Sequence, residues 1–211
     1  MIAISTAYKK ALVAVEIEGK KAFRELDANC KHSENLLPAI DSALQEVEKT
    51  LAQNDKFAVV IGPGSFTGLR ISAALVKGFL AGEEKKNVLP LTTFELMAYS
   101  YIKNFAPKEY FVCIINGLSG YYFVCKFDCK GNKLSAEEMI TKEALEKFQN
   151  TKVCLAEEKL TTVMVDPTAE ELLALINEEF FGKEYISAGE IMPLYLRKSQ
   201  AEDALEEKQK K

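Results

Sequence analysis

The chain has 211 residues, of which 48% are hydrophobic and 27% charged, and its formal net charge is −4. This composition is typical of a soluble globular protein and excludes disordered, collagenous and coiled-coil chains. No apolar run reaches the roughly 18 residues that span a bilayer, and the N-terminus lacks the basic start and long apolar stretch of a secretory signal. We therefore expect a cytoplasmic protein that does not associate with membranes. The mild acidity also disfavours a broad surface that tracks phosphates.

Residues that commonly bind metals are few and poorly spaced. The chain has one histidine, His32, and five cysteines: Cys30, Cys113, Cys125, Cys129 and Cys154. Zinc sites need close cysteine pairs or added histidines, and the Cys125 and Cys129 pair has no second pair to complete it. We therefore expect reduced core thiols and no metal in the isolated chain.

The first half of the sequence has clear periodic patterns. They predict strands at 2–6, 11–17 and 21–28, a helix from 33 or 35 to 51, a strand at 57–61, a helix at 66–81, a strand at 88–91 and a helix at 92–105. Three antiparallel strands followed by strand–helix alternation indicate an α/β fold with a mixed sheet flanked by helices. This is the layout of ribonuclease H-like domains.

The second half has weaker patterns. Strands are expected at 110–115, 121–127 and 153–155, helices at 135–149 and 168–181, and a frayed charged helix at 201–211. Pro107 and its polar neighbours interrupt the apolar pattern. We therefore divide the chain into an N-terminal ribonuclease H-like lobe, 1–105, and a degenerate C-terminal lobe with a charged tail, 106–211.

Residues 62–70, which read Gly-Pro-Gly-Ser-Phe-Thr-Gly-Leu-Arg, join a buried strand to a helix. Exposed N–H groups at such a helix start can bind anions. However, no lysine follows Gly68, so this is not a P-loop, and Thr67 occupies the place of the third glycine of the dinucleotide motif. A tight structural turn is the favoured interpretation, with Gly62, Gly64 and Gly68 allowing the chain to reverse and a neighbouring backbone to approach.

The same segment carries a resemblance to a known family. Residues 62–70, together with 32–38 (His-Ser-Glu-Asn-Leu-Leu-Pro), 92–98 and 193–197 (Pro-Leu-Tyr-Leu-Arg), resemble the TsaB (YeaZ) family of tRNA threonylcarbamoyladenosine (t6A) proteins. The first of these strings is highly specific for that family. The resemblance covers the first hundred residues well and the second lobe in outline.

The resemblance implies a two-lobed, non-catalytic member of the actin, Hsp70 and sugar kinase (ASKHA) superfamily. It implies a heterodimer with the TsaD ligase, which transfers threonylcarbamoyl to N6 of adenosine 37 in tRNAs reading codons that begin with A, and participation of the TsaE ATPase. The resemblance assigns the chain itself no catalytic residue and no cofactor, so ATP or ADP would bind only within the complex. Contact with tRNA would occur through the complex.

Two positions depart from the family pattern. Ser5 stands where many relatives have Asp, and residues 116–120, which read Asn-Gly-Leu-Ser-Gly, replace Asp-Ala-Arg-x-Gly. Roles assigned to those charged groups in relatives are therefore not carried over.

Two other functions compete with the scaffold role. The first is an independent peptidase or nucleotide hydrolase of the same fold, for which His32, Ser33 and Glu34 offer a superficial triad; adjacent residues at a helix start generally do not face one another. The second is direct tRNA binding through Lys152, Lys198 and the lysines of the tail, a charge pattern more typical of a solvated terminus.

The helix at 66–81 is apolar almost all round, and one sheet covers only one helix face. We therefore predict an outward seam shared by the two helices, formed by Leu36, Leu37, Ile40, Leu69, Ala73 and Val76. A partner with an equivalent helix pair would complete a four-helix bundle, and the same seam would allow a homodimer of the isolated chain. Cover by the helix at 33–51 is the alternative explanation for part of this face. The role of Arg70 stays open between a carbonyl cap and a partner contact.

Overall fold

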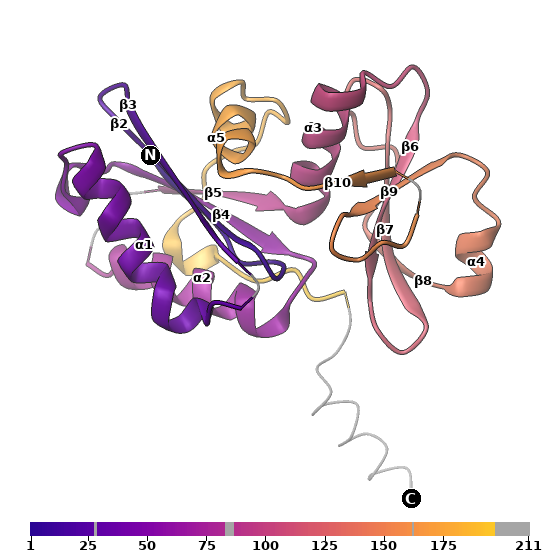
Figure 1. Ribbon diagram of the computed structural model, residues 1–211, viewed down its shortest axis with the longest axis horizontal. Coiled ribbons are helices and arrows are strands. Elements are labelled where there is room, and N and C mark those ends of the chain that lie inside the picture. Colours follow the sequence, from indigo (N-terminus) through magenta and orange to yellow (C-terminus); the bar gives the residue numbers. More distant parts are fainter. Residues whose placement is uncertain (28, 83–86, 162, 197–211) are drawn as a thin grey trace, which may run out of the picture.

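The computed structural model describes residues 1–27, 29–82, 87–161 and 163–196 (Figure 1). In this part of the chain, the strands form two five-stranded mixed sheets flanked by helices. The predicted α/β class with mixed sheets is therefore confirmed. None of the described helices is long and apolar enough to cross a membrane.

The first sheet has the strand order β3-β2-β1-β4-β5. The strands β1 (Ile2–Ser5), β2 (Ala11–Ile17) and β3 (Lys20–Leu26) form an antiparallel meander. The strands β4 (Lys56–Gly62) and β5 (Asn87–Thr92) run parallel to β1. All five strands lie within two residues of their predicted limits.

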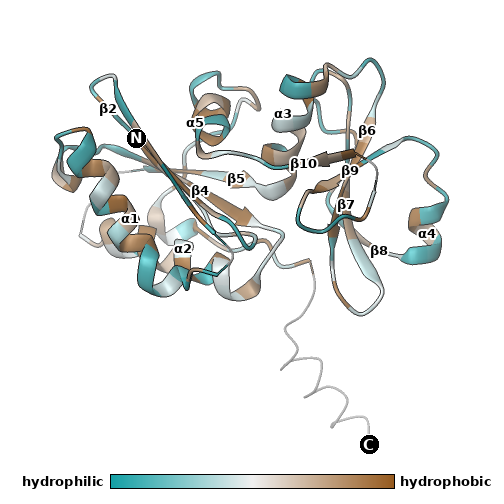
Figure 2. Cartoon of the chain, in the orientation of Figure 1, coloured by the Kyte–Doolittle hydropathy of each residue, from teal (hydrophilic) through white to brown (hydrophobic). Residues whose placement is uncertain are grey.

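Both faces of the first sheet are covered by helices (Figure 1). On one face, α1 (His32–Glu46) and α2 (Phe66–Phe79) pack on alternate strand residues such as Ile4 and Val59. On the other face lie α3 (Thr93–Phe105) and α5 (Ala169–Asn177). Successive strand side chains point to opposite faces, so residues 2–4 of β1 and 57–61 of β4 are all apolar because both faces of the sheet are covered. Figure 2 shows hydrophobic residues concentrated along β4.

The second sheet has the order β10-β9-β6-β7-β8. Its strands are β6 (Phe111–Asn116), β7 (Tyr121–Phe127), β8 (Glu138–Thr141), β9 (Thr151–Leu155) and β10 (Val163–Val165). Here β6, β7 and β8 form the antiparallel meander, and β9 and β10 extend the sheet in parallel from β6. This topology repeats that of β1 to β5.

Several predicted elements of the second half are wrong. Residues 135–149 form β8 and the short helix α4 (Lys142–Glu146), because β8 pairs with the edge of β7 despite its helix-forming sequence. The strand β10 was not predicted. Helix α5 ends at Asn177, just before the left-handed Glu179, rather than at 181. The predicted helix at 201–211 lies outside the described residues.

The two sheets share helix α3, which contacts strands of both. The chain then returns to the first sheet. Helix α5 packs on β2, Ile186 bridges Val88 of β5, and the Leu194 N–H donates to the Ile61 carbonyl at 2.7 Å. The division into lobes at residue 105 stays a prediction about domains. Residues 169–194 nevertheless make many of their contacts with the first sheet.

Candidate functional site: the cleft between the lobes

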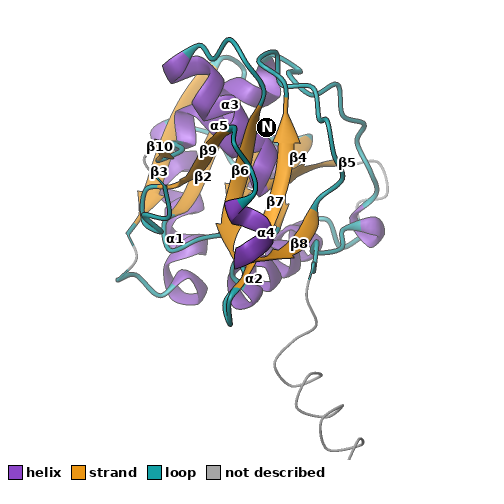
Figure 3. Ribbon diagram, turned by 90° about the vertical axis from the view of Figure 1, so that its right-hand side faces the viewer, coloured by secondary structure: helices purple, strands orange, loops and turns teal. Residues whose placement is uncertain are grey.

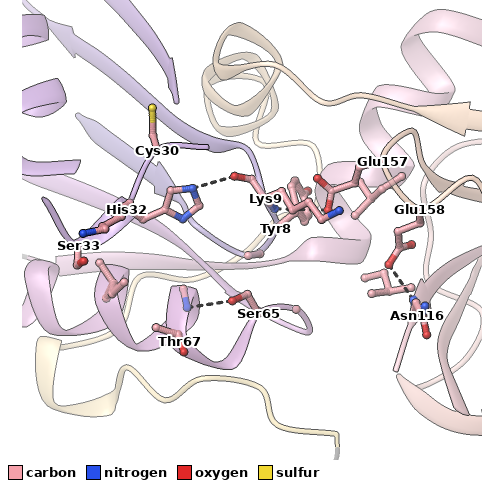
Figure 4. A pocket seen from close by; sticks show the side chains of 17 residues that line it. Tyr8, Lys9, Cys30, His32, Ser33, Ser65, Thr67, Asn116, Glu157 and Glu158 are labelled. Carbon is pink, nitrogen blue, oxygen red and sulfur yellow. Dashed lines mark hydrogen bonds between the residues drawn. The ribbon is translucent and has the colours of Figure 1, made fainter. Parts of the chain in front are cut away.

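A cleft of about 430 Å³ opens between the two sheets, which we call here the first lobe (β1 to β5 with α1 and α2) and the second lobe (β6 to β10) (Figure 4). Parallel sheets commonly bind ligands at the carboxyl ends of their strands, and the ends of β1, β4, β6 and β9 meet here. The lining residues are Ala7, Tyr8, Lys9, Cys30, Lys31, His32, Ser33, Gly64, Ser65, Thr67, Gly68, Ile71, Ile115, Asn116, Leu155, Glu157 and Glu158.

Two glycines of the 62–70 turn allow very close backbone contact with the end of β1. A Cβ at Gly64 would lie 2.2 Å from the Ala7 carbonyl oxygen, and one at Gly68 would lie 1.9 Å from that of Thr6. The Thr6 hydroxyl donates to the Gly68 carbonyl at 2.6 Å. Gly62 has a φ of +121°, a conformation that favours glycine. These positions therefore hold the start of α2 against the first strand.

The start of α1 does not form the superficial triad. Nε2 of His32 lies 2.8 Å from the Lys9 carbonyl oxygen, and the Glu34 carboxylate pairs with Lys31 at 2.9 Å. The imidazole therefore contacts the β1–β2 loop, and Glu34 is turned to a lysine rather than to the histidine. Sequence proximity has not brought a nucleophile, base and orienting acid together here.

The opposite wall holds two carboxylates that the sequence did not single out, Glu157 and Glu158. One Glu158 oxygen accepts from the Asn116 N–H at 2.9 Å, whereas Oε2 is buried without a hydrogen-bond partner among the described residues. Burial, reinforced by the charge of Glu157, raises the pKa of Glu158 to about 7, against the opposing effects of the Asn116 N–H and Lys9. The available sequence signal was a pair of acids directly after an apolar strand.

Tyr8 lines the cleft and is only 6% exposed. Its hydroxyl is buried and has no hydrogen-bond partner in the described part of the chain. Burial is the main cause that raises the pKa of this phenol well above its usual range. Tyr8 is therefore a neutral polar group whose hydroxyl makes no hydrogen bond within the described ranges.

The two positions that depart from the family pattern differ in their hydrogen bonding. Ser5 is fully buried in β1, and its hydroxyl has no partner among the residues described. The Asn116 side-chain oxygen accepts from the Leu118 N–H at 2.9 Å and so stabilises the β6–β7 turn.

Most of the predicted outward seam is internal. Leu36, Ile40, Leu69, Ala73 and Val76 are between 0% and 7% exposed. They are buried because α1 and α2 turn these side chains toward the sheet, so the prediction of an outward seam is wrong for these five. Leu37, at 45% exposed, is the member that faces outward.

Arg70 joins the start of α2 to the returning C-terminal segment. Its guanidinium lies 3.9 Å from the centre of the Phe66 ring, and its Nε donates to the Tyr195 hydroxyl at 3.1 Å. The Phe66 and Tyr195 rings also contact each other, with centroids 4.8 Å apart. These contacts differ from the carbonyl cap considered for Arg70.

All five cysteines are free, and Cys113, Cys125 and Cys154 are buried. Burial raises the pKa of the Cys125 thiol to about 12. No group of three or more His, Cys, Asp and Glu side chains suited to a metal ion occurs within the described ranges. The expected absence of a metal stays a prediction.

Comparison with known proteins identifies the family to which this chain belongs. The sequence model of a family described as TsaD, tRNA N6-adenosine threonylcarbamoyltransferase, matches residues 26–150, which is more than half of the chain. The tRNA threonylcarbamoyladenosine biosynthesis protein TsaB of Haemophilus influenzae is 27% identical, with 93% of each chain covered. The chain belongs to the TsaB (YeaZ) family. It is a TsaB homologue of the t6A tRNA modification pathway.

Solved YeaZ structures confirm the fold. YeaZ from Pseudomonas aeruginosa superposes with a TM-score of 0.75 at 22% identity, covering 92% of this chain and 98% of that chain. A second structure from that organism, described as similar to peptidase YeaZ, superposes with a TM-score of 0.76 at 21% identity. It covers 93% of this chain and 98% of that chain. The predicted two-lobed ASKHA fold is therefore confirmed.

Proposed function

We propose that the chain is a non-catalytic partner subunit of a TsaD ligase. Together with a TsaE ATPase, it would support threonylcarbamoyl transfer to N6 of adenosine 37 in tRNAs reading codons that begin with A. The observation that carries the proposal is the similarity to a TsaB protein over 93% of both chains. We place this function in the cytoplasm, with tRNA bound through the complex.

The contacts of the candidate catalytic side chains support a non-catalytic role. His32 contacts a backbone carbonyl, and Glu34 pairs with a lysine. A nucleophile needs a base within hydrogen-bond reach, and these groups are engaged elsewhere. Any ATP or ADP would bind within the assembled complex rather than in the isolated chain.

The outer side of α1 and α2 is the surface we assign to the ligase. The two helices pack side by side on one face of the first sheet (Figure 1). Leu37 projects an apolar side chain from α1, and Arg70 with Tyr195 forms an exposed cation–aromatic group at the start of α2. Aromatic, arginine and large apolar side chains dominate binding energy at interfaces. A homodimer of the isolated chain through the same surface would compete with the ligase.

The test is reconstitution of threonylcarbamoyl transfer with TsaD and TsaE from the same organism. We expect Leu37→Glu to abolish ligase binding and tRNA modification while the melting temperature stays unchanged, because Leu37 is exposed. Leu134→Glu is the matched control, since Leu134 is 53% exposed and follows β7 in the second sheet. Unchanged ligase affinity in Leu37→Glu would move the interface elsewhere. Peptidase or ATPase turnover by the purified chain alone, lost on mutation of His32, would overturn the non-catalytic role.

A further inference from the structure

We propose that the cleft between the lobes binds a small zwitterion with an apolar side chain, of the free amino acid class. The proposal is independent of the partner function, because it concerns the isolated chain and a surface other than the outer side of α1 and α2. It rests on the distribution of charge across the cleft, on buried polar atoms without partners and on the apolar residues between them.

The two walls of the cleft carry opposite charge. The wall from the first lobe presents Lys9, His32 and the N-terminal turn of α2, and the wall from the second lobe presents Glu157 and Glu158 (Figure 4). Lys31 is neutralised by its pair with Glu34. Lys9 lies closest to the second wall: its backbone N–H donates to Glu157 at 3.4 Å and its charge acts on Glu158, but its ammonium is within ion-pair distance of no described carboxylate. A ligand carboxylate would be stabilised by Lys9 and the helix start, and a ligand ammonium by the two glutamates.

The same balance disfavours a polyanion. A triphosphate in this cleft would face one lysine that makes no ion pair with a described residue, and one helix N-terminus. It would also lie close to the carboxylates of Glu157 and Glu158. Like charges at short range oppose binding, and each phosphate needs its own donors. A ligand with one positive and one negative group matches both walls.

Two buried polar atoms of the cleft residues have no hydrogen-bond partner in the part of the chain that the structure describes. These are Oε2 of Glu158 and the hydroxyl of Tyr8, and Tyr8 is more than nine-tenths buried. Buried polar atoms are nearly always hydrogen-bonded in folded proteins, and leaving one unpaired costs free energy. An ammonium carries three donors, enough for Glu158 and for a second acceptor. The unpaired carboxylate oxygen lies beneath the surface of the second wall, and a ligand ammonium would pair with it once the Glu158 carboxylate rotates toward the cleft.

Apolar side chains complete the cleft. Ile71, Ile115 and Leu155 line it between the charged walls, and Ile115 and Leu155 are almost fully buried. Ligand sites commonly combine an apolar lining with a few polar groups, in volumes of roughly 300 to 1,000 Å³. The volume of about 430 Å³ is at the small end of this range. A leucine-sized side chain fits such a site.

The first experiment is calorimetric titration of the purified chain with L-leucine and two half-ligands. These are 4-methylpentanoate, which lacks the ammonium, and 3-methylbutylamine, which lacks the carboxylate. We expect only L-leucine to bind. Glu158→Gln and Lys9→Met should each weaken binding about tenfold by removing one charge-assisted contact. Glu146→Gln, in an exposed part of α4 away from the cleft, is the matched control and should leave binding unchanged.

The second experiment varies pH. Only the ionised Glu158 attracts an ammonium strongly, and its pKa of about 7 is set by burial and Glu157 against the Asn116 N–H and Lys9, with Tyr8 and His32 also at the cleft. The affinity for L-leucine should rise about tenfold from pH 6 to pH 8, because the ionised fraction rises about tenfold. Glu158→Gln should lose this dependence.

Three results would overturn the proposal: no binding of L-leucine at about 20 mM; equal binding of either half-ligand; or tighter binding of ATP that Glu158→Gln strengthens. Unchanged melting temperatures of the variants show that any loss of binding is not a loss of fold.

Discussion

The two sheets have the same strand topology but unequal covers. In the first sheet, α1 with 15 residues and α2 with 14 residues cover one face and bury a large cluster that includes Ile4, Val59 and Val76. In the second sheet, the corresponding outer face is covered by α4, which has five residues, over a small buried cluster of Val112, Ile114 and Val124 (Figure 3). No described helix lies between β9 and β10 in the position that α2 takes between β4 and β5.

The difference shows how a duplicated topology can divide its tasks. The first sheet presents two long helices whose outer sides are available to a partner. The second sheet keeps α5 as the counterpart of α3 but packs it against β2 of the first sheet. The second sheet contributes one wall of the cleft and part of the shared core. A helix as short as α4 is enough to cover its outer face. Three pairs of substitutions test this inequality.

The largest difference is expected between a glycine of each half: Gly68 in the first turn of α2, and Gly120 between β6 and β7. Gly68→Ala would place a Cβ 1.9 Å from a backbone oxygen, and we expect a loss of about 3 kcal/mol in the free energy of unfolding. Gly120→Ala in the β6–β7 turn meets no atom within 4 Å and is strained only by its φ of +82°, so about 1 kcal/mol is expected. Urea unfolding measures both. Equal losses would mean that the two glycine positions are equally constrained.

The next difference concerns a buried carboxylate in each half. Glu158 has a pKa of about 7 in the folded protein, above its unfolded value, so the folded state binds the extra proton and stability falls as pH rises from about 4.5 through 7. Glu158→Gln should be more stable than the unmodified chain by about 2 kcal/mol at pH 8 and no more stable at pH 4.

Glu95 provides the contrast to Glu158. It is 2% exposed, but it pairs with Lys183 at 3.0 Å and accepts from the Thr92 N–H at 2.7 Å. Glu95→Gln should therefore destabilise the chain at pH 8, because it removes the charge that these donors stabilise. Thermal unfolding across this pH range distinguishes the two. A shift of the same sign in both variants would contradict the assignment.

The smallest difference is expected at helix caps. Thr92 is buried and forms a capping box with Glu95 at the start of α3, so Thr92→Ala should cost about 1 to 2 kcal/mol. Thr141 is exposed and accepts from the Ala144 N–H at 3.4 Å at the start of α4. Thr141→Ala should cost a few tenths of a kcal/mol, roughly, since α4 covers little core. Chemical denaturation measures both losses, provided that the two variants have the same dependence of unfolding free energy on denaturant concentration. A larger loss in Thr141→Ala than in Thr92→Ala would contradict the prediction.

The elements of the first sheet could be predicted because burial on both faces leaves a continuous apolar signal, as at Val59 and Val60. The helix at 135–149 was predicted wrongly because strand pairing outweighs local propensity at β8. The outward seam failed for a different reason. Apolar residues such as Ile40 and Leu69 mark a face to be buried, but the pattern does not say whether the cover comes from the same chain.

Only one wall of the cleft could be predicted from the sequence. Residues 62–70 were recognisable, since their glycines are close together along the chain. Glu158 faces them from a strand end more than 80 residues later, and its importance depends on burial and on one unpaired oxygen. Neither property has a local sequence pattern.

The return of the chain to the first sheet sets an order of events during synthesis. Val88 of β5 bridges Ile186, and the Ala169 N–H donates to Glu25, so these pairs join residues made far apart in time. Ribosomes add about 5 to 20 residues each second, so β5 waits roughly 5 to 20 s for its last neighbour. Helix α5, which packs on β2 and β3, is also made late. Until then, the face of β2 and β3 that α5 will cover is exposed to other nascent chains. The interval makes this face the expected target of molecular chaperones while the protein is being made.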